Sequence, residues 1–421
     1  MPMNPDDRFP RRRVVVTGYG AVTGVGLDAE ETWTSLLAGK SGVVQITQFD
    51  ASAYPATVAS EVKGFQPPVF LDPKEARRMS RIELFALAAA KEAIDRSGIV
   101  VDDKNCDEIG AILGTGGGSL TTTEHEARTM FNRGGMRISP FILPMMLANM
   151  PAAIITRVFG LRGYSSTIVT ACASGTQAIG EAAEVIRRGS AEIILAGGAD
   201  ASVCELGLAS FCVIRALSHR KDDPAGASRP FDGERDGMVA AEAAAILVLE
   251  SLDSALARGA TIYAEIVGYG VSSDAYHVVA PRPDGTGAAR AMVRALKDAR
   301  ATPTEIDYVN AHGTGTQLGD AAETRAIKQA LGDRAYSVPI SSTKSMVGHA
   351  MGAAGAIEAL VTVLTIRDQL IHPTINLHQP DPECDLDYVP NVTRSAKVDL
   401  ALSNSFAFGG HNAVLAIGRY R

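Results

Sequence analysis

One cysteine in this 421-residue sequence lies where its thiol could act as a nucleophile. Cys172 stands in TIVTACASGTQ (167–177), where a strand-like run gives way to a helical pattern over 173–188. A helix N-terminus offers free N–H groups and a positive dipole end, which favour a thiolate and can hold an oxyanion. The alternative is a buried structural cysteine, and the local setting leaves both open. That structural role is predicted for the other four, Cys106, Cys204, Cys212 and Cys384.

Two histidines and a lysine lie in turns that could supply proton chemistry beside such a thiol. His312 follows a predicted strand in NAHGTGTQLGDAAE, and Lys344 and His349 precede an Ala/Gly-rich helical pattern in SSTKSMVGHAMGAAGAIEAL. Ligand sites in α/β folds gather at the carboxyl ends of strands, so these positions are candidates. His277 is a weaker candidate. A surface or structural role is predicted for His125, His219, His372 and His378.

Neither a metal nor a nucleotide cofactor is indicated. The chain has no CxxC or HExxH pattern, so a transition-metal site has little support. GTGGGS (114–119) approximates a dinucleotide-binding turn but lacks the expected strand–helix–strand setting. We therefore expect no cofactor and no metal.

The elements that must position these residues alternate between strand and helix patterns, which favours an α/β fold. A helix is predicted over 80–98, with Ser80 as a possible N-cap and Gly98 past its end. A strand, a glycine turn and a small-residue helix occur in both halves, which suggests a duplication with a seam near 258–261. The polar segment 218–237 is predicted to be a surface loop or lid. Strands are predicted in 11–22, 107–118, 191–200, 244–250, 260–270, 306–313 and 411–420.

Composition excludes several classes of protein. With 46% hydrophobic and 21% charged residues, the chain has the balance of a globular protein rather than a disordered one. A net charge of -7 argues against a nucleic-acid binder, and no apolar run is long enough to cross a membrane. The five scattered cysteines and a start without an apolar signal segment favour a cytoplasmic protein.

Four long motifs, TACASG, NAHGTGT, SSTKSMVGH and NSFAFGGHN, occur in this order and resemble those of the β-ketoacyl-[acyl-carrier-protein] synthases. The likeness is strongest to the type II elongating enzymes of dissociated fatty acid synthesis. It extends through FDASAYPATVASEVKGF, RISPFILPMMLANM, ASRPFDGERDG and HPTINL, so it covers the chain from Arg12 to Arg421.

This resemblance implies the thiolase fold, with two similar halves, each on a five-stranded mixed sheet, in α-β-α-β-α layers and in a homodimer. Residues 1–259 would form the half with the nucleophile, and 260–421 the half with the histidines. The implied reaction is a decarboxylative Claisen condensation, in which malonyl carrier protein elongates an acyl group held on Cys172 by two carbons. A ketosynthase of a polyketide or specialised lipid pathway is the alternative.

The resemblance also implies roles for individual residues. His312 and His349 would stabilise the enolate formed on loss of CO2, and the backbone N–H groups of Cys172 and Phe408 would form the oxyanion hole. The Phe408 side chain would gate the acyl pocket. Lys344 would organise the site through carboxylates, a network to which Asp320, Glu323 and Glu358 are assigned.

Substrate and carrier contacts follow in the same way. Thr314 and Thr316 match hydroxyls that hold the pantetheine amides of acyl carrier protein, the expected partner. The acidic surface of the carrier protein would meet a basic patch. The alternative for Lys74, Arg77 and Arg78 is that they only solvate a helix start. The patch residues are Lys74, Arg77, Arg78 and Arg215.

The sequence departs from the family pattern at several positions. AEAAA (241–245) replaces a glycine-rich Gly-Glu-Gly-Ala-Gly, so the backbone near Glu242 is expected to differ. His411 and Val279 occupy positions that are often Thr, and both departures resemble the mycobacterial long-chain synthases. Gly117 stands where many type II enzymes have an isoleucine at the pocket floor, which predicts a deeper cavity and long acyl primers.

Three rival interpretations are weaker. A non-catalytic partner subunit, like a chain-length factor, would lack the cysteine that Cys172 supplies. Initiating synthases pair cysteine with His and Asn rather than with two histidines. Thiolases need a second catalytic cysteine near the C-terminus, where Cys384 has no fitting turn.

Overall fold

The computed structural model describes residues 11–421, so the first ten residues of the predicted N-terminal half lie outside it. The strands are β1 (Val14–Val22), β2 (Val43–Gln45), β3 (Val58–Ser60), β4 (Ile109–Gly114), β5 (Ser165–Ile168), β6 (Ile193–Ala201), β7 (Ala240–Ser251), β8 (Ala264–Ser273), β9 (Tyr308–Asn310), β10 (Ile340–Ser341), β11 (Leu370–Ile371), β12 (Arg394–Ser395), β13 (Leu400–Ala407) and β14 (His411–Gly418).

The helices alternate with these strands along the chain. They are α1 (Ala29–Leu37), α2 (Pro73–Ala76), α3 (Arg81–Ser97), α4 (Leu120–Arg133), α5 (Ile142–Met146), α6 (Met150–Phe159), α7 (Ser174–Arg187), α8 (Glu205–Val213), α9 (Leu252–Ala257), α10 (Thr286–Ala299), α11 (Gln317–Leu331), α12 (Lys344–Val347) and α13 (Ala354–Asp368).

Two groups of five strands repeat one topology. The first has the order β5-β4-β6-β7-β1, with β5, β4 and β6 parallel and β7 and β1 reversing in turn. The second has the order β10-β9-β13-β14-β8 with the same directions. β1 and β8 pair through Val15–Glu265 and Val16–Ala264, so the predicted two sheets form one continuous sheet.

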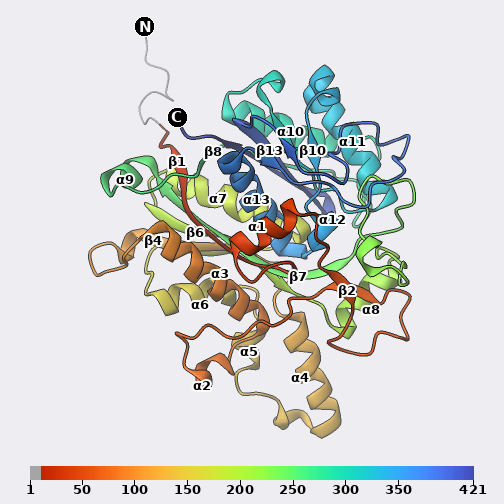
Figure 1. Ribbon diagram of the computed structural model, residues 1–421. Coiled ribbons are helices and arrows are strands. Elements are labelled where there is room, and N and C mark those ends of the chain that lie inside the picture. Colours follow the sequence, from red (N-terminus) through yellow and green to blue (C-terminus); the bar gives the residue numbers. More distant parts are fainter. Residues whose placement is uncertain (1–10) are drawn as a thin grey trace.

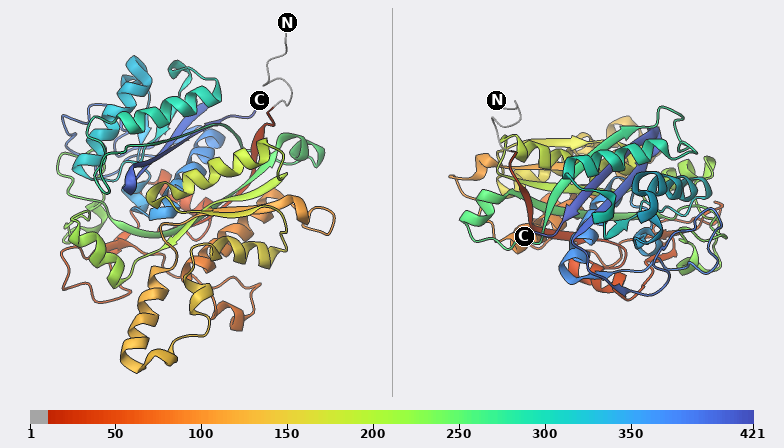
Figure 2. Two further views of the ribbon diagram at one scale, coloured as in Figure 1. Left: turned by 180° about the vertical axis from the view of Figure 1, so that it is seen from behind. Right: turned by 90° about the horizontal axis from the view of Figure 1, so that it is seen from above.

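Helices lie in three layers around these strands, as Figures 1 and 2 show. α3 and α6 cover the outer face of the first group, and α10 and α11 cover that of the second. α7 and α13 lie between the two groups in the largest apolar core. The predicted α-β-α-β-α order is confirmed.

The N-termini of the two central helices meet at glycines. A Cβ on Gly355 would lie 1.9 Å from Thr176 Oγ1, and a Cβ on Gly175 would lie 2.7 Å from the backbone nitrogen of Ala356. Only glycine permits this approach, since real Cβ atoms essentially never come within 3.0 Å of another heavy atom. The short turns before α7 and α13 are thereby held against each other.

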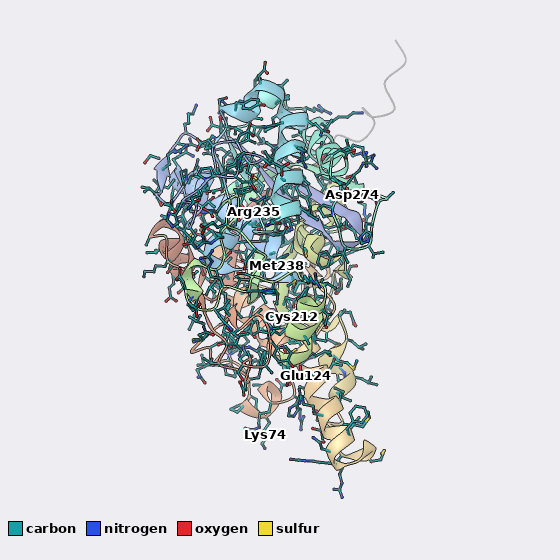
Figure 3. The ribbon with its side chains drawn as sticks, turned by 90° about the vertical axis from the view of Figure 1, so that its right-hand side faces the viewer. Lys74, Glu124, Cys212, Arg235, Met238 and Asp274 are labelled. Carbon is teal, nitrogen blue, oxygen red and sulfur yellow. The ribbon has the colours of Figure 1, made fainter. Side chains whose placement is uncertain are left out.

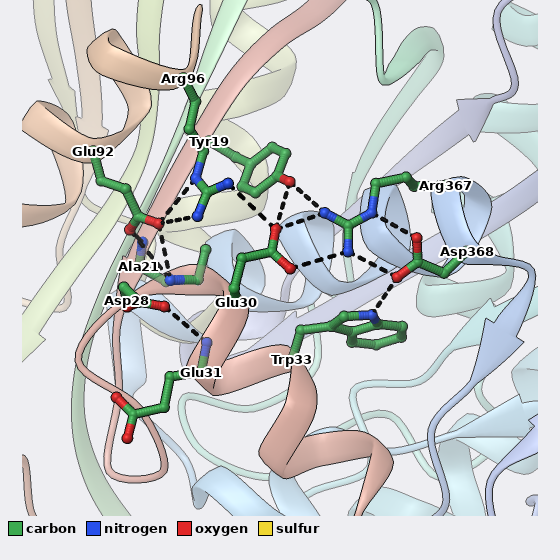
Figure 4. A network of polar contacts seen from close by, with 11 residues as sticks. Tyr19, Ala21, Asp28, Glu30, Glu31, Trp33, Glu92, Arg96, Arg367 and Asp368 are labelled. Atoms are coloured by element: carbon green, nitrogen blue, oxygen red, sulfur yellow. Dashed lines mark hydrogen bonds and ion pairs between the residues drawn. The ribbon is translucent and has the colours of Figure 1, made fainter.

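A network of ion pairs anchors the other end of α13 (Figure 4). Arg367 pairs with Glu30 of α1 at 2.6 Å and with Asp368 at 2.7 Å, and Trp33 Nε1 donates to Asp368 at 2.7 Å. Arg96 of α3 reaches Glu30 at 3.3 Å. Helices α1, α3 and α13 are therefore tied together by charged side chains.

The predicted helix over 80–98 is confirmed, because α3 has Ser80 as N-cap with Glu83 in a capping box and ends at Gly98 with φ +67°. The prediction of a surface loop over 218–237 is wrong for its second part. Residues 226–232 are buried, and Arg235 is 1% exposed because it pairs with Asp320 and Asp381. These ion pairs satisfy charges that would otherwise need water.

Within residues 11–421, no helix is both long and apolar enough to span a bilayer.

Candidate active site

Cys172 lies in a one-turn helix, Ala171–Ala173, between β5 and α7. Ala171 has φ +50°, an unusual conformation for a residue with a side chain. Ser174 holds this turn, because its hydroxyl accepts from the Thr170 N–H at 2.8 Å and lies 2.7 Å from the Ala171 carbonyl oxygen. The fold thus places the thiol at the start of α7, as the sequence predicted.

The surroundings of the thiol pull its pKa in two directions. Burial raises the pKa of Cys172 to about 11, since a thiolate loses its hydration in the interior. The positive charge of Lys344 and the backbone N–H groups of Phe408 and of Cys172 itself act to lower that pKa. Both N–H groups predicted for the oxyanion hole therefore favour negative charge at the sulfur.

His312 and His349 face each other beside this thiol. His312 follows β9, and His349 is pinned to the start of β7, because its N–H donates to Val239 at 2.7 Å and its carbonyl accepts from Ala241 at 3.1 Å. Their ring centroids are 5.4 Å apart, with the rings nearly perpendicular. Burial, assisted by the charge of Lys344, lowers the pKa of each well below its usual value. Both rings are therefore neutral and can donate one N–H each.

The Lys344 ammonium is 1% exposed and uses all three of its hydrogens. Its partners are Glu358, the His312 carbonyl oxygen at 2.7 Å and His312 Nδ1 at 3.2 Å. Because an ammonium only donates, Nδ1 of His312 must accept and Nε2 must carry the hydrogen. Lys344 thus fixes the tautomer of His312 that donates a hydrogen bond through Nε2.

Glu323 anchors the turn that carries His312. Its carboxylate accepts from the N–H groups of His312 at 2.8 Å and of Gly313 at 2.7 Å. Burial nonetheless raises its pKa to about 7, and it raises the pKa of Glu358 to about 7 and of Asp320 to about 6. The three predicted carboxylates therefore occupy one buried region, with Asp320 paired to Arg235 rather than to Lys344.

One pocket brings most of the predicted residues together. Cys172, His312, His349, Glu323 and the gating candidate Phe408 line it. Thr314 and Thr316 line it too, with their hydroxyls 3.0 Å apart. Ala288, Ala322 and Phe406 supply apolar surface, so an acyl chain and a polar arm can both find partners in this cavity.

The structure does not bring every predicted residue to the pocket. Gly117 is exposed and absent from the lining, and a Cβ there would meet no atom within 4 Å. The pocket of the single chain therefore gives no support to its predicted place at the pocket floor, which stays a prediction. Lys74, Arg77 and Arg78 are exposed at α2, and Arg215 is exposed after α8.

These basic residues do not form one cluster in the single chain. Figure 1 places α2 well away from α8. In Figure 3, Lys74 lies far below the pocket residues Met238 and Asp274. Arg215 directly precedes Ala216, which lines the pocket. Of the four basic residues, only Arg215 is adjacent in sequence to a residue of the pocket lining.

The structure adds Asp274 and Asn412, which the sequence did not single out. Asp274 directly follows β8, accepts from Asn412 Nδ2 at 2.8 Å and is 7% exposed in the lining. Its place at the carboxyl end of a strand was a signal that could have identified it. Val279, noted as a departure, also lines the pocket, whereas His411 is exposed.

The alanine-rich stretch around Glu242 remains a regular strand. β7 pairs without interruption with β6, and the buried Glu242 pairs with Arg81 at 2.7 Å. The substituted glycines therefore leave an ordinary backbone here.

Two family models match the chain. "Beta-ketoacyl synthase, N-terminal domain" matches residues 11–255, and "Beta-ketoacyl synthase, C-terminal domain" matches residues 263–378.

Curated relatives match nearly the whole chain. The 3-oxoacyl-[acyl-carrier-protein] synthase 2 of Synechocystis sp. is 50% identical over 411 residues, which are 98% of this chain and 99% of the relative. The protein of the same name from Coxiella burnetii is 45% identical over 409 residues, 97% of this chain and 99% of the relative.

Solved structures share the fold. The ishigamide ketosynthase/chain length factor has a TM-score of 0.92 at 39% identity, covering 98% of this chain and 100% of that one. A type II polyketide ketosynthase in complex with its acyl-carrier protein has a TM-score of 0.90 at 36% identity, with the same coverage. A beta-ketoacyl synthase from Burkholderia phymatum has a TM-score of 0.91 at 38% identity, covering 97% of this chain and 100% of that one.

Proposed function

This chain belongs to the β-ketoacyl synthase family, and from that premise we propose how its pocket performs a decarboxylative condensation between two carrier-bound thioesters. The product is a β-ketoacyl carrier protein that is two carbons longer than the primer. The observation that supports this most is the joint placement of Cys172, His312, His349 and the Phe408 N–H around one pocket.

In the first half-reaction Cys172 attacks the thioester carbonyl of the acyl carrier protein. The bond from the carbonyl carbon to the pantetheine sulfur breaks, and the pantetheine leaves as a thiol with the proton that Cys172 gave up. The oxyanion forms where the backbone N–H groups of Cys172 and Phe408 converge. Such donors are already oriented before the negative charge develops, so they stabilise it without rearrangement. A thioester on Cys172 remains.

In the second half-reaction malonyl carrier protein loses CO2. The electron pair of the broken C–C bond moves into a thioester enolate, whose oxygen accepts from Nε2–H of His312 and from the ring N–H of His349. Neutral imidazoles suit this role, because each can donate an N–H hydrogen bond to the enolate oxygen without giving up its proton. The enolate carbon then attacks the acyl-Cys172 carbonyl, the bond from that carbon to the cysteine sulfur breaks, and the released thiolate takes a proton from water.

The remaining predicted residues support these two steps. Lys344 and Glu323 hold His312, while Thr314 and Thr316 offer hydroxyls to the pantetheine amides. The exposed basic residues at α2 and after α8 would receive the acidic carrier protein. We assign the nucleophile to the half 1–259 and the histidines to the half 260–421. The five free thiols support a cytoplasmic setting.

A second copy of the chain is expected to cover the face formed by α4, α5 and the edge strand β5. α4 buries none of its own residues, and β5 pairs with β4 alone. Exposed apolar side chains on this face are Met130, Phe131, Met136, Leu143 and Leu147. Apolar patches and open strand edges of this kind mark interfaces.

The test is to incubate the protein with acyl and malonyl carrier proteins and to measure the product by mass. A β-ketoacyl product two carbons longer than the primer is expected. If only unchanged acyl carrier protein and unchanged malonyl carrier protein were found, the proposed function would be rejected.

A polyketide ketosynthase is the second candidate, because one solved relative is a type II polyketide ketosynthase in complex with its acyl-carrier protein. The same incubation separates the two candidates. One extension of a saturated primer indicates fatty acid elongation, whereas repeated extension of the unreduced β-keto product indicates polyketide synthesis.

A further inference from the structure

A buried polar cluster lies behind the pocket, outside its lining. It contains Tyr308 of β9, Ser341 of β10, Thr343 and His372, all fully buried. His372 occurs in the HPTINL segment and was predicted to be a surface or structural residue. The structure places its ring at the centre of this cluster.

The hydrogen bonds fix which nitrogen of His372 carries the hydrogen. Nδ1 lies 3.0 Å from the Pro373 carbonyl oxygen, which can only accept, so Nδ1 must donate. Nε2 is then an acceptor with one lone pair. Its nearest partner is the Thr343 hydroxyl at 3.0 Å, closer than Ser341 at 3.3 Å and Tyr308 at 3.4 Å.

This acceptor sets the direction of the next bonds toward the pocket. The Thr343 oxygen accepts from Asn310 Nδ2 at 3.1 Å, and its hydroxyl lies closer to His372 Nε2, at 3.0 Å, than to Asn310 Oδ1, at 3.3 Å. Asn310 Nδ2 also reaches the backbone oxygen of Glu358 at 3.4 Å. Asn310 Nδ2 therefore donates in two directions, to Glu358 of α13 and, through the Thr343 hydroxyl, toward His372 of the HPTINL segment.

The same chain joins the two segments that carry the reacting groups. Asn310 ends β9 two residues before His312, and Thr343 directly precedes Lys344. Lys344 Nζ lies 3.2 Å from His312 Nδ1. This contact depends on the spacing between the two segments. Loss of the bond at Thr343 would free Asn310 to rotate its amide and would relax that spacing.

We propose that His372 is a positioning residue for the condensation: through Thr343 and Asn310 it holds the Lys344–His312 contact that keeps Nε2–H of His312 aimed at the enolate oxygen. It touches no substrate. The inference rests on the proposed function of His312, and it predicts that decarboxylation depends on His372 while acyl transfer to Cys172 does not.

The test compares three full-length variants with the wild type. His372→Leu removes the acceptor at similar volume. His372→Gln returns an acceptor oxygen near the position of Nε2. Tyr308→Phe is the matched control, because it removes a hydroxyl from the same cluster and leaves the bond between Thr343 and His372 in place.

Two rates are measured for each variant: the loading of Cys172 by acyl carrier protein, and the release of CO2 from malonyl carrier protein. His372→Leu is expected to lower kcat for CO2 release about 100-fold, the cost of misplacing a reacting group by about 1 Å, with KM and the loading rate little changed. His372→Gln should recover most of this loss, and Tyr308→Phe should stay near the wild type.

Equal loss of both rates in His372→Leu, or an equal loss of CO2 release in Tyr308→Phe, would overturn the positioning role. If His372→Leu does not fold, Thr343→Val removes the same bond from the other side and carries the same expectation. Absence of condensation in the wild type would instead reject the proposed function.

Discussion

At the scale of single residues, burial decides the chemistry of this pocket more than local sequence does. Cys172, His312, His349, Glu323 and Glu358 all have pKa values displaced mainly by loss of water. The neutral histidines follow from this displacement.

Glu323 should make folding stability depend on pH. Its folded pKa of about 7 is raised above its ordinary 4.5, so its contribution is complete below pH 4.5 and is lost as the pH rises through 7. That loss amounts to about 3 kcal/mol, and Glu323→Gln should remove it. Denaturant unfolding of both proteins at pH 5 and pH 8 measures the difference. If the difference in free energy of unfolding between the wild type and Glu323→Gln were the same at pH 5 and pH 8, the assignment would be contradicted.

Gly117 should set the length of acyl chain that the enzyme accepts, if the acyl group reaches the loop after β4. We expect the wild type to extend acyl groups beyond about twelve carbons, and Gly117→Ile to shorten that limit without unfolding the protein, because a side chain there meets no atom within 4 Å. Gly117→Ala should be intermediate. An assay over primers of graded length decides this, and identical chain-length profiles would remove Gly117 from the acyl pocket.

At the scale of elements, the turns before α7 and α13 are related by the duplication. Ala171 and Met351 both have positive φ, at 50° and 43°, and each opens a one-turn helix before a central helix. Gly175 and Gly355 then make matching close contacts across the interface of the two helices. The first turn carries the Cys172 thiol, and the second has Gly352 at the corresponding position.

The helix contact gives a stability prediction. Gly355→Ala should lower the free energy of unfolding by about 1–3 kcal/mol, because its Cβ would overlap Thr176 and force the helices apart. Urea unfolding measures the change, with Gly117→Ala as the unconstrained control. Unchanged stability in Gly355→Ala would show that the helix N-termini can separate freely.

Much of this arrangement could be predicted from the sequence, and the exceptions have physical causes. α3 was identified from its caps and periodicity, and the strand–turn–helix at Cys172 from the change of period, because these signals are local. Burial of Arg235 and of His372 could not be predicted, because their partners, such as Asp381 and Thr343, are distant in the chain. Polar composition made the segment of Arg235 look exposed, whereas His372 was assigned only a surface or structural role.

At the scale of the whole molecule, the single chain leaves one face uncovered. Figure 1 shows α4 extending from the body of the protein, and this helix carries Phe131, a residue that is 80% exposed. The same face includes the edge strand β5, which precedes Cys172 in the chain. Association through this face would brace the loop that carries the thiol.

The predicted dimer can be tested by placing negative charges on the exposed apolar face. Phe131→Asp combined with Met136→Asp should convert a dimer into a monomer in sedimentation velocity, because two carboxylates would have to lose water in an apolar contact. Leu256→Asp, on exposed α9, is the control and should leave the mass unchanged. A wild type that sediments as a monomer at micromolar concentration would contradict the proposed interface.

The central claim assigns the acyl thioester to Cys172 and decarboxylation to the two histidines, and one variant separates these roles. Cys172→Ala, incubated with acyl and malonyl carrier proteins, should still release CO2 while forming no β-ketoacyl product. Undiminished condensation by Cys172→Ala would contradict the account.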